Sequence, residues 1–154
     1  AIIRRPAYYA VTPAMNAILS SYTKQGGALL VSGSYLGEES QSIPCTQALL
    51  HDVLHARYET SITDWNEQGI IGLGTTMDIP RWINPEHYPV TRPEVLIPTN
   101  GAFTPFVYEL SNRSAAVAYS GDYRSVLLGF PFEAIRSPRD RDLVMISLLD
   151  FLTQ

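Results

Sequence analysis

The sequence has little charge, a single cysteine and no long apolar run. The last two shortages each exclude a kind of structure. Charged residues make up 17% of the 154 residues, against about a quarter in a typical globular chain. With Cys45 as the one cysteine, neither an intrachain disulfide nor a cysteine-based zinc cluster can form. No apolar run approaches the roughly 20 residues that cross a bilayer, so we expect no membrane span. The first residues also lack the layout of a signal peptide.

A surplus of basic residues is also missing. Eleven Lys and Arg residues stand against fifteen Asp and Glu residues, which gives a net charge of -4. Proteins that bind nucleic acid depend on a basic surface to neutralise phosphates, so we expect no nucleic-acid partner. The small charged fraction predicts either an extensive buried surface or a surface that a partner covers.

The composition that is present is that of a folded globular protein. Hydrophobic residues make up 45% of the chain, which excludes a disordered segment. A length of 154 residues lies within the range of one domain with one core. We therefore expect a single domain over residues 1–154.

Helical and strand patterns alternate along the chain. Thr12 and Pro13 are typical of a helix start, and apolar residues at helical spacing continue to a stop at residues 26–27. Residues 28–32 are a short apolar run typical of a buried strand, followed by a second helix over about 46–54 and a strand over 56–62. Six of the eleven prolines lie between residues 78 and 105, which predicts loops and short edge strands there.

The last third of the chain repeats strand patterns before a final helix. We predict a strand pair over residues 106–110 and 115–119, a further buried strand over 125–129, and a helix that begins at Ser137 and Pro138. This order predicts an α/β fold: a three-layer sandwich with a mostly parallel central sheet. Because such sheets normally begin with a strand, we expect a piece of a larger polypeptide. Its first strand is supplied upstream or reduced to residues 1–3.

Two short motifs carry a resemblance to a known family. Residues 33–37 read Gly-Ser-Tyr-Leu-Gly after a buried strand, and residues 128–133 read Leu-Gly-Phe-Pro-Phe-Glu before the terminal helix. Together they resemble the class I glutamine amidotransferase-like superfamily, whose elbow reads Gly-x-Cys-x-Gly and whose late stretch reads Gln-Phe-His-Pro-Glu. The resemblance covers the topology from about Met15 to Leu152 and implies a flavodoxin-like fold.

The resemblance implies a degenerate active site. The catalytic cysteine falls on Tyr35 and the histidine on Pro131, while the acidic partner falls on Glu133. A phenol with an ordinary pKa near 10 and no imidazole beside it cannot replace an activated thiolate at neutral pH. Cys45 lies eight residues after Gly37, too far along the chain to occupy the elbow. The implied protein has no amidotransferase activity and no cofactor.

The late stretch, residues 123–135, resembles the amidotransferase-like modules of secreted multidomain proteins of Bacteroidetes, some of them labelled xanthan lyase. That resemblance implies a non-catalytic accessory or interaction module of an exported protein, in the periplasm or at the cell surface. Its partners would be neighbouring domains of the same polypeptide. The alternative is a component of a polysaccharide lyase or hydrolase, or a peptidase, that acts through Ser34, Tyr35, Glu133 or a histidine.

Three further groups of residues each allow a functional and a structural interpretation. His51 and His55 are four residues apart, a spacing that lets two imidazoles on one helix face reach a zinc ion. A third ligand at a family spacing is missing from the sequence, although His87 or Glu59 could serve if the fold brought them in. The structural interpretation is a half-buried pair that caps the end of the helix.

Ser34 follows a buried strand, where a nucleophile would pair with a histidine. It could equally be a turn serine that bonds local backbone amides. The proline-rich segment contains aromatic rings that could stack on a glycan, with Trp65 and Tyr35 nearby in the sequence. Alternatively, these rings pack over the edge of the sheet. The candidate ligand-binding residues there are Trp82, His87 and Tyr88.

Overall fold

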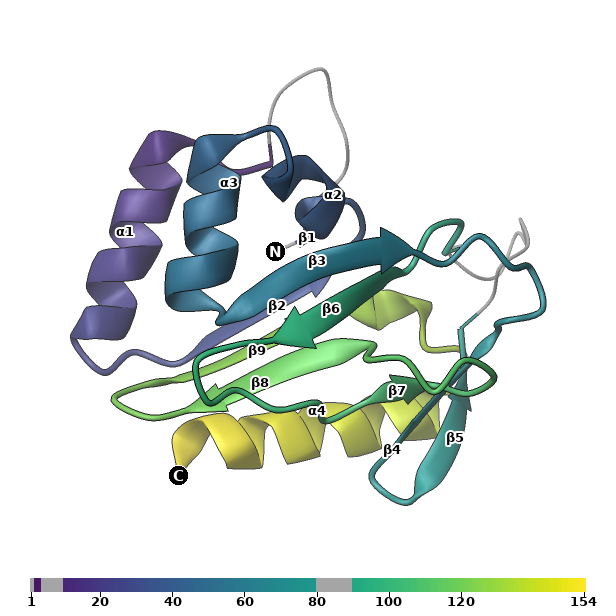
Figure 1. Cartoon of the computed structure of the whole chain (residues 1–154). Coiled ribbons are helices and arrows are strands. Elements are labelled where there is room, and N and C mark those ends of the chain that lie inside the picture. The colour runs from purple at the N-terminus through teal and green to yellow at the C-terminus, as the bar shows by residue number, and fades with distance from the viewer. Residues whose placement is uncertain (1, 4–9, 80–89) are drawn as a thin grey trace.

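The computed structural model describes residues 2–3, 10–79 and 90–154, and shows a mixed α/β fold (Figure 1). A four-stranded sheet has the order β1-β2-β9-β8, formed by β1 (Ile2–Ile3), β2 (Leu29–Gly33), β9 (Arg124–Leu128) and β8 (Ala116–Ser120). The pairs β1–β2 and β2–β9 are parallel, and β8 pairs antiparallel with β9. Residues 2–3 form a short strand that pairs with β2 at one side of this sheet.

Helices pack against this sheet from two sides (Figure 1). One group comprises α1 (Pro13–Lys24), α2 (Leu36–Ser40), α3 (Pro44–Ala48) and the π-helical segment η1 (Leu49–Val53). Val117 and Leu127 of the sheet share a buried cluster with Leu50 of this group. The long helix α4 (Pro138–Thr153) joins the other cluster, in which Val126 of β9 packs with Val144. Adjacent strand residues enter different clusters because side chains alternate between the faces of a sheet.

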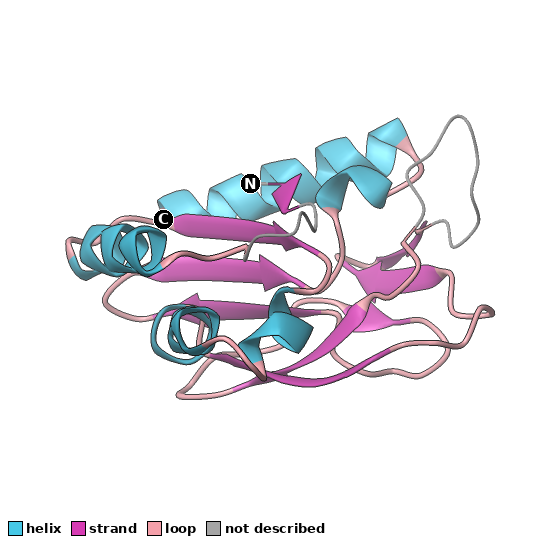
Figure 2. Ribbon diagram, turned by 90° about the horizontal axis from the view of Figure 1, so that it is seen from above, coloured by secondary structure: helices cyan, strands magenta, loops and turns pink. Residues whose placement is uncertain are grey.

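Two smaller antiparallel sheets complete the fold. One pairs β3 (Ala56–Ser61) with β6 (Glu94–Pro98), and the other has the order β5-β4-β7, from β5 (Thr75–Asp78), β4 (Gly69–Gly72) and β7 (Val107–Tyr108). Figure 2 shows the strands of the four-stranded sheet side by side, with α4 running along them. The expected parallel pairing is therefore confined to one sheet. Among the described residues, no helix combines the length and the apolar character that a bilayer crossing requires.

Several predicted elements are confirmed. The first helix begins after Thr12, whose Oγ1 accepts the amide of Met15 at 3.2 Å. The terminal helix begins after Ser137, whose Oγ accepts the amide of Asp140 at 3.3 Å. The strand predicted at residues 28–32 is β2, the helix predicted at 46–54 is α3 with η1, and the strand predicted at 56–62 is β3. Helix α2 was not predicted.

The predicted pairing of residues 106–110 with 115–119 is confirmed only in part. Val107 forms an isolated antiparallel bridge with Ser114, and Ala115 N donates to Phe106 O at 2.9 Å. Strand β7 pairs with β4, and β8 forms its hairpin with β9 across residues 121–123. The three-residue connection favours that hairpin over the seven residues between β7 and β8, because short loops close antiparallel pairs most readily. The proline-rich region also contains a buried strand, β6, where Leu96 is inaccessible and donates its amide to Ser114 O at 3.2 Å.

Candidate functional site: a closed elbow after β2

Ser34 and Tyr35 lie immediately after β2, at the place where the resemblance expects an elbow. The backbone of Tyr35 is left-handed, with φ 73° and ψ 0°, and the residue is the N-cap of α2. A left-handed conformation costs a residue with a side chain about 1–2 kcal/mol. The segment thus has a strand, a strained sharp turn and a helix, which is the local geometry of a nucleophile elbow. A phenol stands at its centre.

Pro131 and Glu133 follow β9, the strand next to β2. Because β2 and β9 are parallel, the segments after them leave the same edge of the sheet. The segment after β9 is bonded to β2 itself, since the backbone N–H of Phe132 donates to Ser32 Oγ at 3.3 Å. Pro131 is buried and Glu133 is half-buried. The structure therefore brings the two predicted motifs to one edge, and a buried proline stands where the family pattern has a histidine.

The central residue of this site, Glu94, was missed by the sequence analysis. Its side chain reaches from the first position of β6 to the N-terminus of α2 and is 2% exposed. Oε2 accepts the amide of Gly37 at 2.9 Å, and Oε1 accepts the amide of Glu38 at 2.8 Å. The first amides of a helix have no partner within the helix. Free amides at the start of a helix can bind an anion, and here the chain's own carboxyl group occupies those of Gly37 and Glu38.

The backbone of Glu94 is fixed as firmly as its side chain. Its N–H donates to Gly129 O at 2.7 Å, and its carbonyl accepts the hydroxyl of Tyr108 at 2.8 Å. A Cβ placed on Gly129 would lie against that same carbonyl oxygen, so the close approach of the two backbones requires glycine there. The carboxyl group is consequently held at the elbow from both the β6 and the β9 sides.

Burial raises the pKa of Glu94 from its ordinary value of 4.5 to about 7. The amides of Glu38 and Gly37 act in the opposite direction because they stabilise the carboxylate, and the guanidinium of Arg92 does the same. The nearby carboxylate of Glu38 adds to the increase. The group therefore changes charge near neutral pH, which is the range in which a general acid or base works. Both oxygens of the Glu94 carboxyl group nevertheless accept backbone amides of the chain itself.

The surface above Glu94 is lined by polar side chains that contact one another. Arg92 Nη1 lies 3.6 Å from Glu38 Oε1, and these side chains are 42% and 36% exposed. Tyr35 Oη lies 3.4 Å from Thr91 Oγ1. The phenol thus contacts a hydroxyl group, with two carboxyl groups close to the elbow. Neither a thiol nor an imidazole is part of this cluster as far as the described residues show.

The two described histidines lie near the opposite edge of the parallel sheet. His55 follows η1, and its backbone is left-handed with φ 48°, so it does not continue the helix that contains His51. His55 Nε2 lies 2.9 Å from the hydroxyl of Tyr123, which precedes β9. The expectation that both imidazoles share one helix face is wrong. Within residues 2–3, 10–79 and 90–154, no group of three His, Cys, Asp or Glu residues is placed to hold a metal ion.

His55 and its neighbours form a hydrogen-bonded aromatic cluster. The Tyr123 hydroxyl donates to Val53 O at 2.8 Å, and Asn100 Nδ2 lies 3.4 Å from His55 Nδ1. The ring of Tyr119 is 3.9 Å from the His55 ring between centroids. Burial lowers the pKa of His55, against a smaller opposite effect of Asp52, and burial raises the pKa of Tyr123 to about 12. These partners favour the interpretation of His55 as a structural residue.

The remaining predicted residues lie on other elements or outside the described part of the chain. Trp82, His87 and Tyr88 lie outside the described residues, and so the aromatic platform stays a prediction. Trp65 is 47% exposed, in the segment between β3 and β4. Cys45 lies on α3, where its thiol donates to Val11 O at 3.1 Å.

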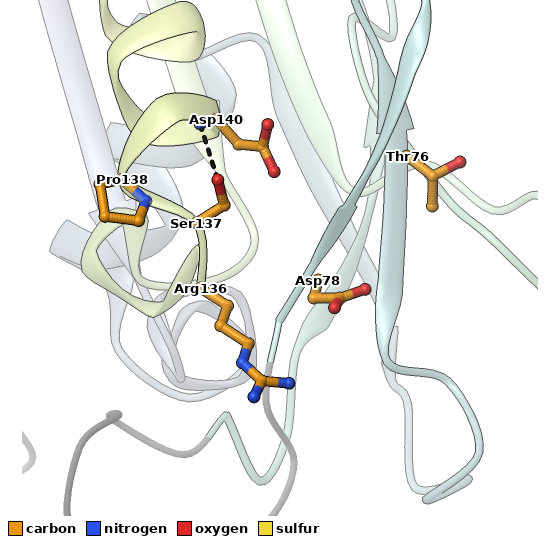
Figure 3. A pocket seen from close by; sticks show the side chains of 6 residues that line it. All are labelled: Thr76, Asp78, Arg136, Ser137, Pro138 and Asp140. Atoms are coloured by element: carbon orange, nitrogen blue, oxygen red, sulfur yellow. Dashed lines mark hydrogen bonds between the residues drawn. The ribbon is translucent and has the colours of Figure 1, made fainter.

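A cavity of about 380 Å³ lies between β5 and the first turn of α4 (Figure 3). None of Ser34, Tyr35, Pro131 and Glu133 lines it. Its walls carry charges of both signs, and its lining residues are Thr76, Asp78, Arg136, Ser137, Pro138 and Asp140. The cavity is therefore separate from the predicted site.

One signal in the sequence could have identified Glu94. It is an acidic residue at the start of the apolar run Val95, Leu96 and Ile97, directly after Pro93. A carboxyl group beside a buried strand must find donors. Its donors lie 56 and 57 residues earlier in the chain, however, and no local pattern specifies such a distant pair.

Comparison of the chain with protein-family models gives no match, and no curated protein matches its sequence.

Proposed function

We propose that this chain is a non-catalytic accessory or interaction module of an exported multidomain protein. Its fold would be the class I amidotransferase-like, flavodoxin-like three-layer sandwich, with a degenerate site at Tyr35. The observation that carries the proposal is the occupation of the Gly37 and Glu38 amides by the Glu94 carboxyl group. A substrate-derived anion at the elbow would have to displace a buried, doubly hydrogen-bonded side chain.

The chemistry around the elbow supports the same conclusion. Acyl transfer needs a nucleophile, a base that removes its proton, and donors for the developing oxyanion. Tyr35 is a phenol whose hydroxyl contacts Thr91 Oγ1, Pro131 has no titratable group, and Glu94 occupies the helix amides. The family nucleophile and base are therefore replaced at Tyr35 and Pro131, and two amides of the first turn of α2 are already bonded.

A hydrolase or lyase acting through Ser34, Tyr35 or Glu133 is the competing function. It would need a histidine or an open pocket beside these residues. Within the described part of the chain, His51 and His55 lie near the other edge of the sheet, and the cavity at Asp78 and Arg136 is lined by different residues. His87 lies outside the described residues. We therefore favour the non-catalytic function.

The proposal is tested by assaying the wild-type chain against L-glutamine, an activated ester, a peptide library and polysaccharides. Matched variants are Tyr35→Phe, Ser34→Ala, Glu133→Gln and Cys45→Ala, with His55→Ala as a control distant from the elbow. We expect no turnover that differs between the wild type and the elbow variants. Turnover that falls by an order of magnitude or more in Tyr35→Phe, Ser34→Ala, Glu133→Gln or Cys45→Ala, and persists in His55→Ala, would overturn the proposal.

A further inference from the structure

Asn100 and Gly101 form the tip of an exposed turn that follows β6. Both residues have a left-handed backbone, with φ 52° and 83°, and the amide of Ala102 donates to Thr99 O at 2.9 Å. Two left-handed central residues closed by such a hydrogen bond form a type I′ turn, in which Asn followed by Gly is a preferred pair. A Cβ placed on Gly101 would meet no heavy atom within 4 Å. The pair is therefore open to solvent.

This turn brings a nucleophile and an electrophile together. The backbone nitrogen of Gly101 directly follows Asn100, whose side-chain amide carbon is the electrophile. Among the described residues, none accepts a hydrogen bond from the Gly101 N–H. Glycine is also the least hindered neighbour an asparagine can have, because it lacks a Cβ. The turn therefore contains both reactants for closure of a succinimide ring.

We propose that Asn100 deamidates spontaneously in the folded chain and that the carboxylate produced favours the charged form of His55. Ring closure joins the Gly101 nitrogen to Cγ of Asn100 and breaks the bond from Cγ to Nδ2. The side-chain nitrogen leaves as ammonia with the proton of the Gly101 N–H. Water then opens the ring at either carbonyl carbon, which gives aspartate or isoaspartate. In sum, an amide and water become a carboxylic acid and ammonia, and nothing is oxidised or reduced.

The Asn100 side chain contacts the ring of His55. The Tyr123 hydroxyl donates to Val53 O, so Nε2 of His55 must donate to that hydroxyl, 2.9 Å away. The other nitrogen of the neutral ring, Nδ1, is then an acceptor, and Asn100 Nδ2 donates to it at 3.4 Å. A carboxylate in place of this amide has no proton to donate. It favours a ring with a proton on both nitrogens, because opposite charges then face each other.

The other groups around His55 leave this direction unchanged. Burial lowers the pKa of His55, and Asp52 has a smaller opposing effect. A carboxylate at position 100 acts in the same direction as Asp52. The titratable groups that face the ring from the surrounding elements are Asp52 of η1, Tyr119 of β8, and Tyr123 with Asp122 before β9.

The isoaspartyl product acts on the same contact through the backbone. It lengthens the main chain by a carbon atom inside the turn, directly after Thr99, whose amide donates to His55 O at 2.8 Å. Each product therefore changes how the turn meets His55. This inference is independent of the elbow and of the proposed absence of catalysis.

Asn112 is an internal control for the deamidation. It is exposed and has the same φ of 52°, but the residue after it is Arg113. The folded chain is incubated at pH 8, and peptide mass spectrometry measures the exchange of NH for O at each asparagine. Conversion at Asn100 should exceed that at Asn112 at least about tenfold, because only Gly101 lacks a Cβ. Asn100→Gln should remove the conversion at this position, since its longer side chain closes a ring far more slowly.

Two results would overturn the proposed site. Equal conversion at Asn100 and Asn112 would show that the neighbouring glycine has no effect in this fold. Conversion of Asn100 in urea but not in the folded chain would show that the turn protects the pair.

The variant Asn100→Asp tests the effect on His55 without the reaction. NMR titration should give the His55 ring a higher midpoint in this variant than in the wild type. Asn112→Asp adds the same charge at another turn and should leave the His55 midpoint at its wild-type value. An unchanged midpoint in Asn100→Asp, or equal increases in both variants, would contradict the coupling between the turn and His55.

Discussion

Glu94 Oε2 accepts the backbone amide of Gly37 at 2.9 Å, across 57 residues of sequence. This hydrogen bond joins the start of β6 to the first turn of α2 and, with the amide of Glu38, fills the turn that follows Tyr35. A carboxyl group that occupies helix amides both stabilises the turn and prevents another anion from using it. Fold stability and the proposed loss of catalysis therefore depend on the same contact.

Stability should decrease as the pH rises through neutrality. The folded chain raises the pKa of Glu94 to about 7, whereas the unfolded chain leaves it near 4.5. The protonated form is therefore favoured in the fold, and its contribution is fully present below pH 4.5 and is lost as the pH rises to about 7. Linkage over this interval gives a loss of about 3 kcal/mol. Urea unfolding of the wild type at pH 5 and at pH 8 measures it.

The variant Glu94→Gln separates the pH dependence of stability that is due to Glu94 from that of the other titrating groups. The amide side chain does not titrate, so the decrease in the free energy of unfolding between pH 5 and pH 8 should become smaller. It retains one acceptor oxygen for two donors, so it should also be less stable than the wild type at pH 5, by about 1–3 kcal/mol. Glu67→Gln is the matched control, because Glu67 accepts the amides of Leu110 and Ser111 at 2.9 Å each. An unchanged slope in Glu94→Gln would contradict the assignment.

The left-handed backbone of Tyr35 predicts an unusual order of stability for two variants at this position. Tyr35→Ala and Tyr35→Gly both remove the ring, but only glycine adopts φ 73° without strain. Tyr35→Gly should therefore be more stable than Tyr35→Ala by about 1 kcal/mol, the reverse of the usual order in a helix. Thermal unfolding of the two variants measures the difference. Equal or greater stability of Tyr35→Ala would show that the turn is unstrained in solution.

The elements that the sequence predicted correctly are those with local signals. The cap residues Thr12 and Ser137, each before a proline, fixed the starts of α1 and α4, and the apolar run at 28–32 fixed β2. The sequence analysis missed the pairing of β7 with β4, because these strands lie far apart along the chain. Local patterns show which segments are strands, but the choice of partner is made by tertiary packing.

The candidate site was predictable only in part, for the same reason. The position of Tyr35 after β2 and of Pro131 after β9 followed from the order of elements, and parallel pairing then placed both at one edge. The hydrogen bonds from the Gly37 and Glu38 amides to Glu94 could not be predicted, because they depend on how close β6 and α2 lie in the folded chain. The prediction that His51 and His55 share one helix face was wrong, because η1 ends before His55 and the backbone of His55 is left-handed.

Gly129→Ala should destabilise the fold more than Gly121→Ala. At Gly129 an added methyl group would meet the backbone carbonyls of Glu94 and Ala115, which cannot move without breaking the hydrogen bond from Glu94 N to Gly129 O. At Gly121 the obstacle is the end of the Tyr119 side chain, which yields more readily than two backbone carbonyls although its ring packs against His55. We expect a loss of about 2–4 kcal/mol for Gly129→Ala and about 1 kcal/mol for Gly121→Ala. Equal losses in urea unfolding would contradict the close approach.

His55 should titrate below its ordinary pKa of 6.5 in the folded chain and near 6.5 in urea. Burial favours the neutral ring, so the stability that depends on it is present above pH 6.5 and is lost as the pH falls through the lowered pKa. NMR titration of the His55 ring in the folded and the urea-unfolded chain provides the measurement, and identical midpoints in both states would refute the assignment.

Tyr123→Phe removes the hydroxyl that donates to Val53 O and should lower the stability of the fold by about 1 kcal/mol.

Amide hydrogen exchange at Gly37 and Glu38 tests the closed elbow most directly. These amides occupy the first turn of α2, where the acceptor is the Glu94 side chain. By NMR at one fixed pH, both should exchange slowly in the wild type. In Glu94→Gln at least one should exchange about tenfold faster or more, while the amides of the β8–β9 hairpin keep their rates. Equal protection of Gly37 and Glu38 in both proteins would contradict the account, because the elbow would then be closed by something other than Glu94.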